Sequence, residues 1–342
     1  MKHKNIIKTA GAVLSGLLIV NLLSAGIYTL PAKYSVVGKA TPEVWESNAP
    51  VILGTEGYAY NHTDQNGYNN PDGITDGRYA LALGSSHTQG FNVSRKENYC
   101  SLYNEYAKVQ QKPLLYNAGM DANNFADIVK HFPAAVTQFA DAEYFVIETP
   151  YFNFTEAALT DALQTVEYRE STPKTFPQKI YGFIQSMPLA RLLVRQWMET
   201  DKSEFDKAFF QATANREITE VVSIDYYRYK ALLEQCFASL RDGTDKPIVL
   251  IYHCEPEMSE NGVSFPYESI ENHAVLPLIN ALCETYDITL IDPTEVYMEN
   301  YAKNHTLPYG FSNTVYGEGH LNAVGHELIA SLLIDADKEA NR

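Results

Sequence analysis

The sequence predicts an α/β fold in which helices cover both faces of an open parallel sheet. Short apolar runs of four to six residues recur along the chain, as expected for strands that are buried on both faces. Amphipathic stretches such as 124–139 and 269–286 lie between these runs, and such strand–helix alternation favours parallel strands. The chain has 342 residues, of which 45% are hydrophobic. That is enough material for one large core.

Five runs are the candidate strands, and each is mostly apolar. They are 78–83 (RYALAL), 113–116 (PLLY), 144–148 (YFVIE), 247–252 (PIVLIY) and 288–291 (ITLI). In open α/β sheets the chemistry lies outside the carboxyl ends of the strands. The residues that directly follow these runs are therefore the first candidates for a functional site.

The amino-terminal region, residues 1–33, predicts export of the rest of the chain. It holds four lysines and no acidic residue, and residues 9–30 carry no charge. As a helix, this uncharged run spans roughly 33 Å, enough to cross the hydrocarbon layer of a membrane. We predict a cytoplasmic stub and a transmembrane signal-anchor, with an extracytoplasmic domain in a single-pass membrane protein. The alternative is secretion after cleavage of a signal peptide near the small residues 24–26.

The charge of the remaining chain excludes one class of partner. The protein has 26 basic and 42 acidic residues, a formal net charge of −16. Since four lysines lie in residues 1–33, residues 34–342 carry 22 basic and 42 acidic residues, a formal charge of −20. An acidic surface repels phosphate backbones, so we expect no nucleic acid partner.

Residues 34–342 divide into two parts. Residues 34–77 carry turn signals at 66–67, 70–73 and 76–77, and we expect a stalk and a hairpin-like lead-in there. Residues 78–342 form one predicted catalytic domain. Within it, residues 155–243 show helical periodicity and no convincing strand. This helical insertion follows the carboxyl end of the third strand, where it would wall or cap a site.

Two short motifs point to nucleophilic chemistry. The first strand runs into Gly84-Ser85-Ser86, a small-residue turn that exposes a hydroxyl and backbone N–H groups together. Near the carboxyl end, His320 lies in a glycine-flanked loop just before a helix that starts near Asn322. A serine hydroxyl is a weak nucleophile at its free pKa and needs a base to accept its proton.

This pair of motifs resembles those of the SGNH (GDSL-like) hydrolase superfamily. The resemblance covers residues 60–154 and 245–334 and implies a three-layer α/β/α fold with a parallel five-stranded, flavodoxin-like sheet. It also implies a serine esterase or acyltransferase in which Ser86 is the nucleophile and His320 the general base. For the oxyanion hole it implies the N–H groups of Ser86 and Gly119 and the side chain of Asn153. Ser85, where the family usually has Asp, resembles the membrane-anchored branch linked to cell-wall and exopolysaccharide acylation.

Other positions depart from the family pattern. Gly317 stands where the third triad member usually lies, so we predict either that Glu318 takes that role or that a Ser–His dyad operates. The block around Asn153 lacks its usual form, and Asn123 or Asn124 is the alternative oxyanion residue.

Three histidines near these motifs have separate interpretations. His87, beside the nucleophile, is a candidate substrate contact. His253, after the fourth strand, is expected at the rim of the site, either as a substrate contact or as a packing residue. A metal site at Glu318, His320 and His326 is disfavoured because the spacing does not place both histidines on one helical face. We therefore expect His326 to be a hydrogen-bonded structural residue.

The predicted function is a serine esterase or O-acyltransferase that acts on acyl esters of cell-envelope or extracellular polysaccharide. It would proceed through an acyl-serine, with no metal and no organic cofactor. The expected partners are an acylated carbohydrate or cell-wall polymer, the membrane through the amino-terminal helix, and a membrane acyltransferase. The alternative is a noncatalytic glycan-binding surface protein on a degenerate fold of the same type.

Overall fold

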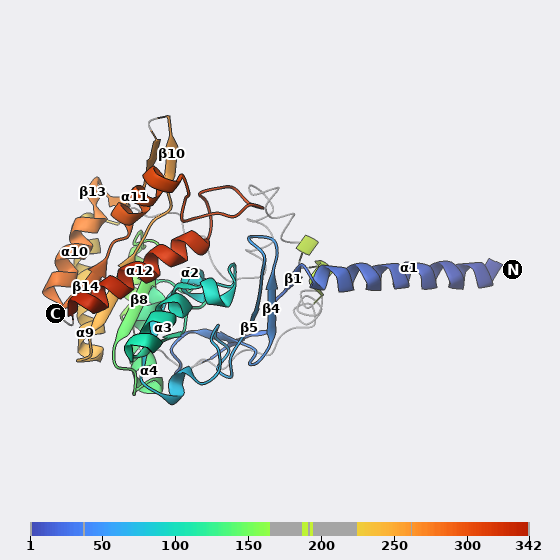
Figure 1. The fold of residues 1–342 in the computed structure, drawn as a ribbon, viewed down its shortest axis with the longest axis horizontal. Coiled ribbons are helices and arrows are strands. Elements are labelled where there is room, and N and C mark those ends of the chain that lie inside the picture. Colours follow the sequence, from blue (N-terminus) through green and yellow to red (C-terminus); the bar gives the residue numbers. More distant parts are fainter. Residues whose placement is uncertain are drawn as a thin grey trace.

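A computed structural model gives the fold of the chain (Figure 1). It describes residues 2–36, 38–164, 187–190, 192–193, 224–260 and 262–340.

A five-stranded parallel sheet forms the centre of the domain. Its spatial order is β7 (Leu114–Asn117), β6 (Tyr79–Leu83), β8 (Phe145–Thr149), β9 (Ile248–Tyr252) and β14 (Ile288–Ile291). All four neighbouring pairs are parallel, which confirms the predicted sheet. The strand order reverses between β6 and β8, and in open α/β sheets ligands bind at such a switch point.

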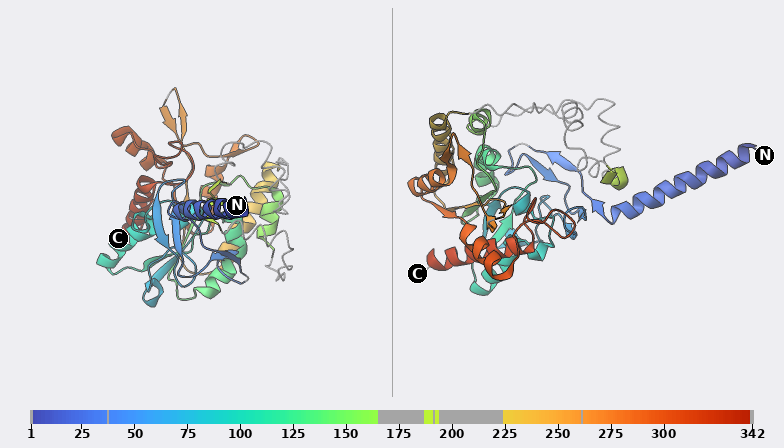
Figure 2. Two further views of the ribbon diagram at one scale, coloured as in Figure 1. Left: turned by 90° about the vertical axis from the view of Figure 1, so that its right-hand side faces the viewer. Right: turned by 90° about the horizontal axis from the view of Figure 1, so that it is seen from above.

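Helices cover both faces of this sheet (Figures 1 and 2). Successive side chains of β6 enter opposite cores, with Leu81 and Leu83 in one cluster and Ala80 and Ala82 in the other. The first cluster packs against α4 (Phe125–Gln138), α9 (Tyr226–Gly243) and α10 (Val275–Thr285). The second packs against α3 (Tyr99–Gln110) and α12 (Ala323–Ala340). The three-layer α/β/α prediction is confirmed.

The amino-terminal helix α1 (Lys2–Ala25) projects away from the domain, as both figures show. Leucines such as Leu14, Leu18 and Leu22 are exposed on it. The membrane-spanning helix predicted in this region is not found, because among the described residues no helix is both long and apolar enough to cross a bilayer.

Residues that follow α1 form small antiparallel sheets. One has the order β1 (Tyr28–Thr29), β4 (Pro50–Leu53) and β5 (Ala59–His62), and the other pairs β2 (Lys33–Ser35) with β3 (Glu43–Trp45). The expected lead-in hairpin is β4–β5, which turns at residues 54–58 rather than at the turn signals 66–77. No stalk forms over the described part of 34–77, because Trp45, Val51 and Tyr68 bury their side chains in the same core as Leu81.

The predicted insertion is helical at both of its described ends. Helix α5 (Glu156–Ala162) begins it and α9 ends it at Gly243. Residues 165–186, 191 and 194–223 lie outside the described part of the chain, so the interior of the insertion stays a prediction.

Short elements complete the domain. They are η1 (Ile74–Asp76), α2 (Ser86–Gln89), η2 (Arg95–Glu97), β10 (Glu257–Ser259), β11 (Gly262–Ser264), β12 (Ser269–Ile270), β13 (His273–Ala274) and α11 (Thr294–Asn304). Of these, α2 matters most for function, because it follows β6 at the switch point of the sheet.

Candidate active site

The serine turn between β6 and α2 places one hydroxyl at the carboxyl edge of the sheet. Ser85 caps α2 by accepting a hydrogen bond from the His87 N–H at 3.2 Å, so Ser86 is the first helical residue. A Cβ atom at Gly84 would lie only 2.0 Å from Thr88 Oγ1, and therefore only glycine fits between the strand and the helix. Ser86 itself is half-buried.

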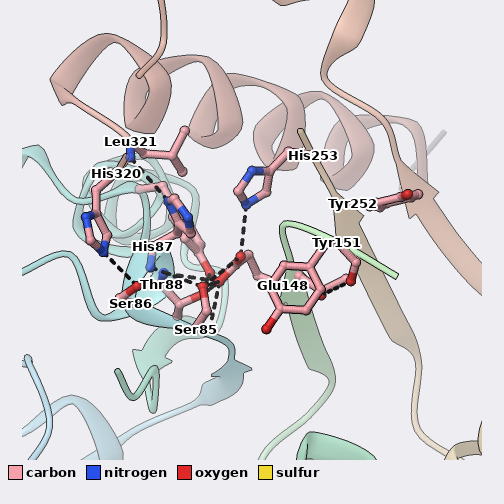
Figure 3. Close-up of polar contacts among 12 residues, drawn as sticks. Ser85, Ser86, His87, Thr88, Glu148, Tyr151, Tyr252, His253, His320 and Leu321 are labelled. Atoms are coloured by element: carbon pink, nitrogen blue, oxygen red, sulfur yellow. Dashed lines mark hydrogen bonds and ion pairs between the residues drawn. The ribbon is translucent and has the colours of Figure 1, made fainter. Parts of the chain in front are cut away.

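His320 meets this serine from the loop that precedes α12. Its Nε2 lies 2.8 Å from Ser86 Oγ (Figure 3). The Gly310 N–H donates to the His320 carbonyl at 3.0 Å, which closes the loop. Asn322 then starts α12, because its Oδ1 accepts from the N–H groups of Val324 and Gly325. The structure thus brings together Ser86 and His320, as the sequence motifs predicted.

A carboxylate from the β4–β5 turn, that of Glu56, bonds the other ring nitrogen of His320. Glu56 Oε2 lies 2.7 Å from His320 Nδ1, and Oε1 accepts from the His320 backbone N–H at 2.8 Å. Glu56 is buried. Because an ionised carboxylate only accepts hydrogen bonds, Nδ1 carries the proton and Nε2 is free to accept from the Ser86 hydroxyl. This is the tautomer that a general base requires.

Glu318 does not hold His320, contrary to the prediction. Its side chain is exposed, whereas the Nδ1 of His320 is bonded to Glu56. The backbone explains the difference. Gly319 has φ +87°, and a Cβ atom there would lie 2.4 Å from Glu56 Oε1. The glycine thus leaves the space beside His320 for an acid that arrives from another part of the chain.

A second carboxylate, that of Glu148 near the end of β8, lies beside the serine turn (Figure 3). It is fully buried. It accepts from the N–H groups of Ser85 (2.9 Å) and Thr88 (3.2 Å) and from both of their hydroxyls. His253 Nε2 lies 2.9 Å from its other oxygen. One carboxylate therefore fixes both ends of the Ser85–Thr88 turn that carries the candidate nucleophile.

The pKa of Glu148 reflects two opposed effects. Burial alone would raise it, but the hydrogen bond and electrostatic interaction with His253 and the hydrogen bond from Thr88 outweigh burial and hold the pKa at about 2. The group is thus a carboxylate at neutral pH. A buried carboxylate with this many donors is a stable anchor for the turn.

His253 is not a substrate contact in this structure, which corrects the first of its two predicted roles. It is fully buried, and its two nitrogens are bonded to Glu148 and to the hydroxyl of Tyr309. The position after β9 is the expected one, but the side chain points into the protein. Its bonding fits a structural support of Glu148.

His87 is also buried rather than open to substrate. Its Nδ1 accepts from the Leu321 N–H at 3.2 Å, and its ring lies 5.2 Å from that of His320. Burial, with His253 as a neighbour, lowers the pKa of His87 well below its ordinary value, so the ring is neutral and accepts this bond. His87 therefore supports the backbone next to His320.

The other two predicted oxyanion residues, Gly119 and Asn153, have different surroundings in the structure. The Gly119 N–H already donates to Asn117 Oδ1 at 2.9 Å, and a Cβ atom at Gly119 would lie 2.3 Å from the Gln89 nitrogen. Close packing on α2 accounts for this glycine. Asn153 is exposed, and none of the hydrogen bonds found among the described residues joins it to the site.

Asn123, the alternative oxyanion residue, is the better placed amide. It is buried, and its Nδ2 lies 3.3 Å from the carbonyl oxygen of Gly84, two residues before Ser86. Its Oδ1 has no hydrogen-bond partner among the described residues. Asn124 instead caps α4 by accepting from the Asp127 N–H.

His326 is structural, as predicted. Its Nδ1 accepts from the Tyr99 N–H at 3.3 Å, and its ring stacks on Tyr99. Burial lowers its pKa to about 3. Within the described ranges, no group of three His, Cys, Asp or Glu side chains is arranged to hold a metal ion. The four cysteines are buried free thiols.

Glu56 and Glu148 are the site residues that sequence reasoning missed. Glu56 lies in a glycine-bounded turn, Gly54-Thr55-Glu56-Gly57, more than 260 residues before His320. No spacing rule links it to the histidine. The only local signal is an acid in a tight turn between two alternating strands. Glu148 is the second-last residue of an otherwise mostly apolar strand, and the only sequence signal for its role is a charge at that position.

Comparisons with known proteins find remote similarities of fold. No family model matches the chain, and no curated protein matches it. Among solved structures, an acetyl xylan esterase named AlAXEase is 13% identical with TM-score 0.40, covering 75% of this chain and 98% of its own. The esterase EstA from Pseudoalteromonas is 10% identical with TM-score 0.41, covering 78% and 100%. A protein named as a GDSL-like lipase, from Parabacteroides merdae, is 12% identical with TM-score 0.40, covering 76% and 94%.

Proposed function

We propose that this protein is a serine ester hydrolase of the SGNH (GDSL-like) type. The observation that carries the proposal is the continuous line from Ser86 Oγ through both nitrogens of His320 to the Glu56 carboxylate, with contacts of 2.8 and 2.7 Å. A nucleophile, a base within hydrogen-bond reach and an acid that orients the base are what acyl transfer requires.

In the proposed reaction the Ser86 oxygen attacks the ester carbonyl while its proton passes to His320 Nε2. Glu56 stabilises the imidazolium that forms and keeps its ring in place. The tetrahedral intermediate collapses to an acyl-serine, and His320 gives the proton to the departing alcohol. A water molecule then repeats the sequence, which releases the acid and restores the serine.

We assign the oxyanion hole to the Ser86 N–H and the Asn123 side-chain amide. Asn123 is supported by its burial and by its position beside Gly84 at the serine turn. Removing one oxyanion donor from such a site costs about 3–4 kcal/mol of barrier. We therefore expect Asn123→Ala to lower kcat by about 10²–10³-fold, whereas Asn153→Ala leaves it unchanged within about 2-fold.

The proposed substrates are acyl esters of cell-envelope or extracellular polysaccharide. This substrate class, and transfer of the acyl group to a sugar hydroxyl as the alternative to hydrolysis, rest on the resemblance of the sequence motifs. A membrane acyltransferase is the proposed partner. Incubation with an acetylated polysaccharide and a second, unacetylated glycan distinguishes the two reactions. A hydrolase releases free acetate, and a transferase moves acetate to the second glycan.

Export of the domain is part of the same proposal. It is supported by the lysines at the amino end and by the uncharged run 9–30. Fractionation of cells and protease treatment of intact cells measure it directly. A domain that stays protected from external protease after removal of the outer barriers contradicts export.

A fluorophosphonate probe tests the proposed activity. We expect covalent labelling of the wild-type protein and no labelling of Ser86→Ala, with hydrolysis of p-nitrophenyl acetate lost in parallel. Absence of labelling in a folded wild-type protein would contradict the proposal that the protein is a serine enzyme. It would favour instead the noncatalytic glycan-binding protein.

A further inference from the structure

Asn313 binds the turn that carries Glu56 through both the oxygen and the nitrogen of its side-chain amide. Its Oδ1 accepts from the Gly57 N–H at 2.9 Å, and its Nδ2 donates to the carbonyl oxygens of Gly54 (3.0 Å) and Gly57 (3.1 Å). The Asn313 amide therefore forms hydrogen bonds with the backbone on both sides of Glu56. All three hydrogen bonds found for this side chain within the described part of the chain go to that turn.

Asn313 belongs to the same loop as His320. The Gly310 N–H donates to the His320 carbonyl at 3.0 Å, and the Gly317 N–H donates to the Tyr309 carbonyl at 3.1 Å. These two bonds close the segment 309–320 into a compact unit. Asn313 thus links the loop that carries His320 to the turn that carries Glu56. The turn lies in the small β1–β4–β5 sheet, outside the central parallel sheet.

The turn that carries Glu56 is tightly packed at Gly57. Gly57 has φ +70°, and a Cβ atom there would lie 2.5 Å from the Asn92 carbonyl oxygen and 2.8 Å from the Phe311 ring. Asn92 Nδ2 also donates to the Glu56 carbonyl at 3.2 Å. The packing at Gly57 is a second, independent sign that the position of the turn is fixed.

We propose that Asn313 is a positioning residue that keeps the Glu56 carboxylate within hydrogen-bond distance of His320 Nδ1. This inference rests on the proposed function. Asn313 acts through the acid and touches neither the serine nor the base. Because a misplacement of about 1 Å is enough to cost about 10²-fold in rate, a turn released on one side by loss of Asn313 should lower activity by at least about 10-fold.

A double-mutant cycle measures whether Asn313 acts through Glu56. The variants are Asn313→Ala, Glu56→Ala and the double variant, and the readout is kcat/KM for p-nitrophenyl acetate. Asn280→Ala is the matched control, because it removes an exposed Asn whose amide bonds Glu284 on α10. We expect at least about 10-fold loss from Asn313→Ala alone, less than about 2-fold further loss in the Glu56→Ala background, and no loss in the control. Losses that multiply, or a single loss within about 2-fold, overturn the proposal.

Proton NMR provides a readout that does not need catalysis. The proton that His320 Nδ1 shares with Glu56 should give a low-field signal that Glu56→Ala abolishes. We expect Asn313→Ala to broaden or lose the same signal and Asn280→Ala to keep it. If the wild type shows no esterase activity but this response is present, the proposed function fails and the positioning role stands. If the wild type is active and Asn313→Ala keeps both signal and rate, the positioning role fails.

Discussion

At the scale of single residues, the orientation of His320 depends on one distant carboxylate. Glu56 receives both the ring and the backbone N–H of His320, so it fixes the rotation of the ring as well as its tautomer. The three residues follow the chain order acid, serine, histidine. Their roles are assigned from geometry and not from this order, because the same three roles occur in different orders on different folds.

The pair Glu56→Gln and Glu318→Gln separates the two acids. A glutamine at position 56 keeps the size of the side chain but presents an amide that no longer favours the proton on Nδ1. Loss of such a carboxylate in a Ser–His–Asp triad costs about 10⁴-fold in kcat, and we expect about 10²–10⁴-fold here. Glu318→Gln should change kcat by less than about 2-fold, because the side chain is exposed. Esterase kinetics that reverse this order contradict the assignment of Glu56.

At the scale of elements, the serine turn is supported by the end of β8. The Glu148 carboxylate accepts hydrogen bonds from four donor groups of Ser85 and Thr88 and also contacts His253 Nε2. The strand order places β8 beside β6, and this adjacency lets one carboxylate reach the whole turn.

Loss of this carboxylate should therefore destabilise the fold. A buried donor left without its acceptor costs about 1–3 kcal/mol, and Glu148 accepts from several such donors. We therefore expect Glu148→Gln to lower the free energy of unfolding by at least about 2 kcal/mol in urea titrations. Glu105→Gln is the control, because Glu105 pairs with Lys108 on an exposed surface. Exposed pairs contribute about 0–1 kcal/mol. Equal effects from the two substitutions would show that Glu148 does not anchor the turn.

The small sheet β1–β4–β5 connects the amino-terminal segment to the acid. The Tyr58 hydroxyl donates to the Gly26 carbonyl at 3.2 Å, and a Cβ atom at Gly54 would lie 2.7 Å from the Ile27 carbonyl oxygen. Residues just after α1 therefore pack directly on the turn that carries Glu56. Gly26 and Ile27 therefore help to position the turn that carries Glu56.

A methyl group at Gly54 tests that contact. Gly54→Ala should push β1 away from the turn, displace Glu56 and lower kcat/KM by about 10-fold or more. Gly16→Ala is the control, because nothing lies within 4 Å of a Cβ atom there. The measurement is ester hydrolysis together with thermal unfolding. An unchanged rate in a folded Gly54→Ala protein would mean that the sheet is not needed to place the acid.

At the scale of the whole molecule, buried ionisable groups predict loss of stability in acid. His326 has a pKa of about 3 in the folded state and about 6.5 when unfolded. Between these values the unfolded chain binds more protons, so stability falls as the pH drops below 6.5. The expected loss from this group is about 2 kcal/mol at pH 5. Glu148, with its pKa of about 2, adds a loss that begins only below about pH 4.3.

Urea titrations at several pH values measure this dependence. The slope of the unfolding free energy against pH between 5 and 6.5 should be smaller in His326→Gln than in the wild type, whatever the absolute stability of the variant. An identical slope in the two proteins would contradict the buried, neutral state of His326.

The sequence allowed the central sheet to be predicted because its strands are short apolar runs, each visible in isolation. Ser86 and His320 were predictable for the same reason, since each lies in a local motif next to a strand or a helix. Glu56 and Glu148 were not, because their roles arise from contacts across hundreds of residues or between neighbouring strands. The burial of His87 and His253 also depends on packing, which position along the chain does not reveal.

Trapping the acyl-enzyme tests whether Ser86, His320 and Glu56 form a catalytic triad. The wild-type protein is mixed with p-nitrophenyl acetate, quenched in acid within the first turnover and analysed by peptide mass spectrometry. We expect one acetyl group on Ser86, formed much more slowly in His320→Ala and Glu56→Gln. An active protein with no acetyl group on Ser86, or with the acetyl group on another residue, would contradict it.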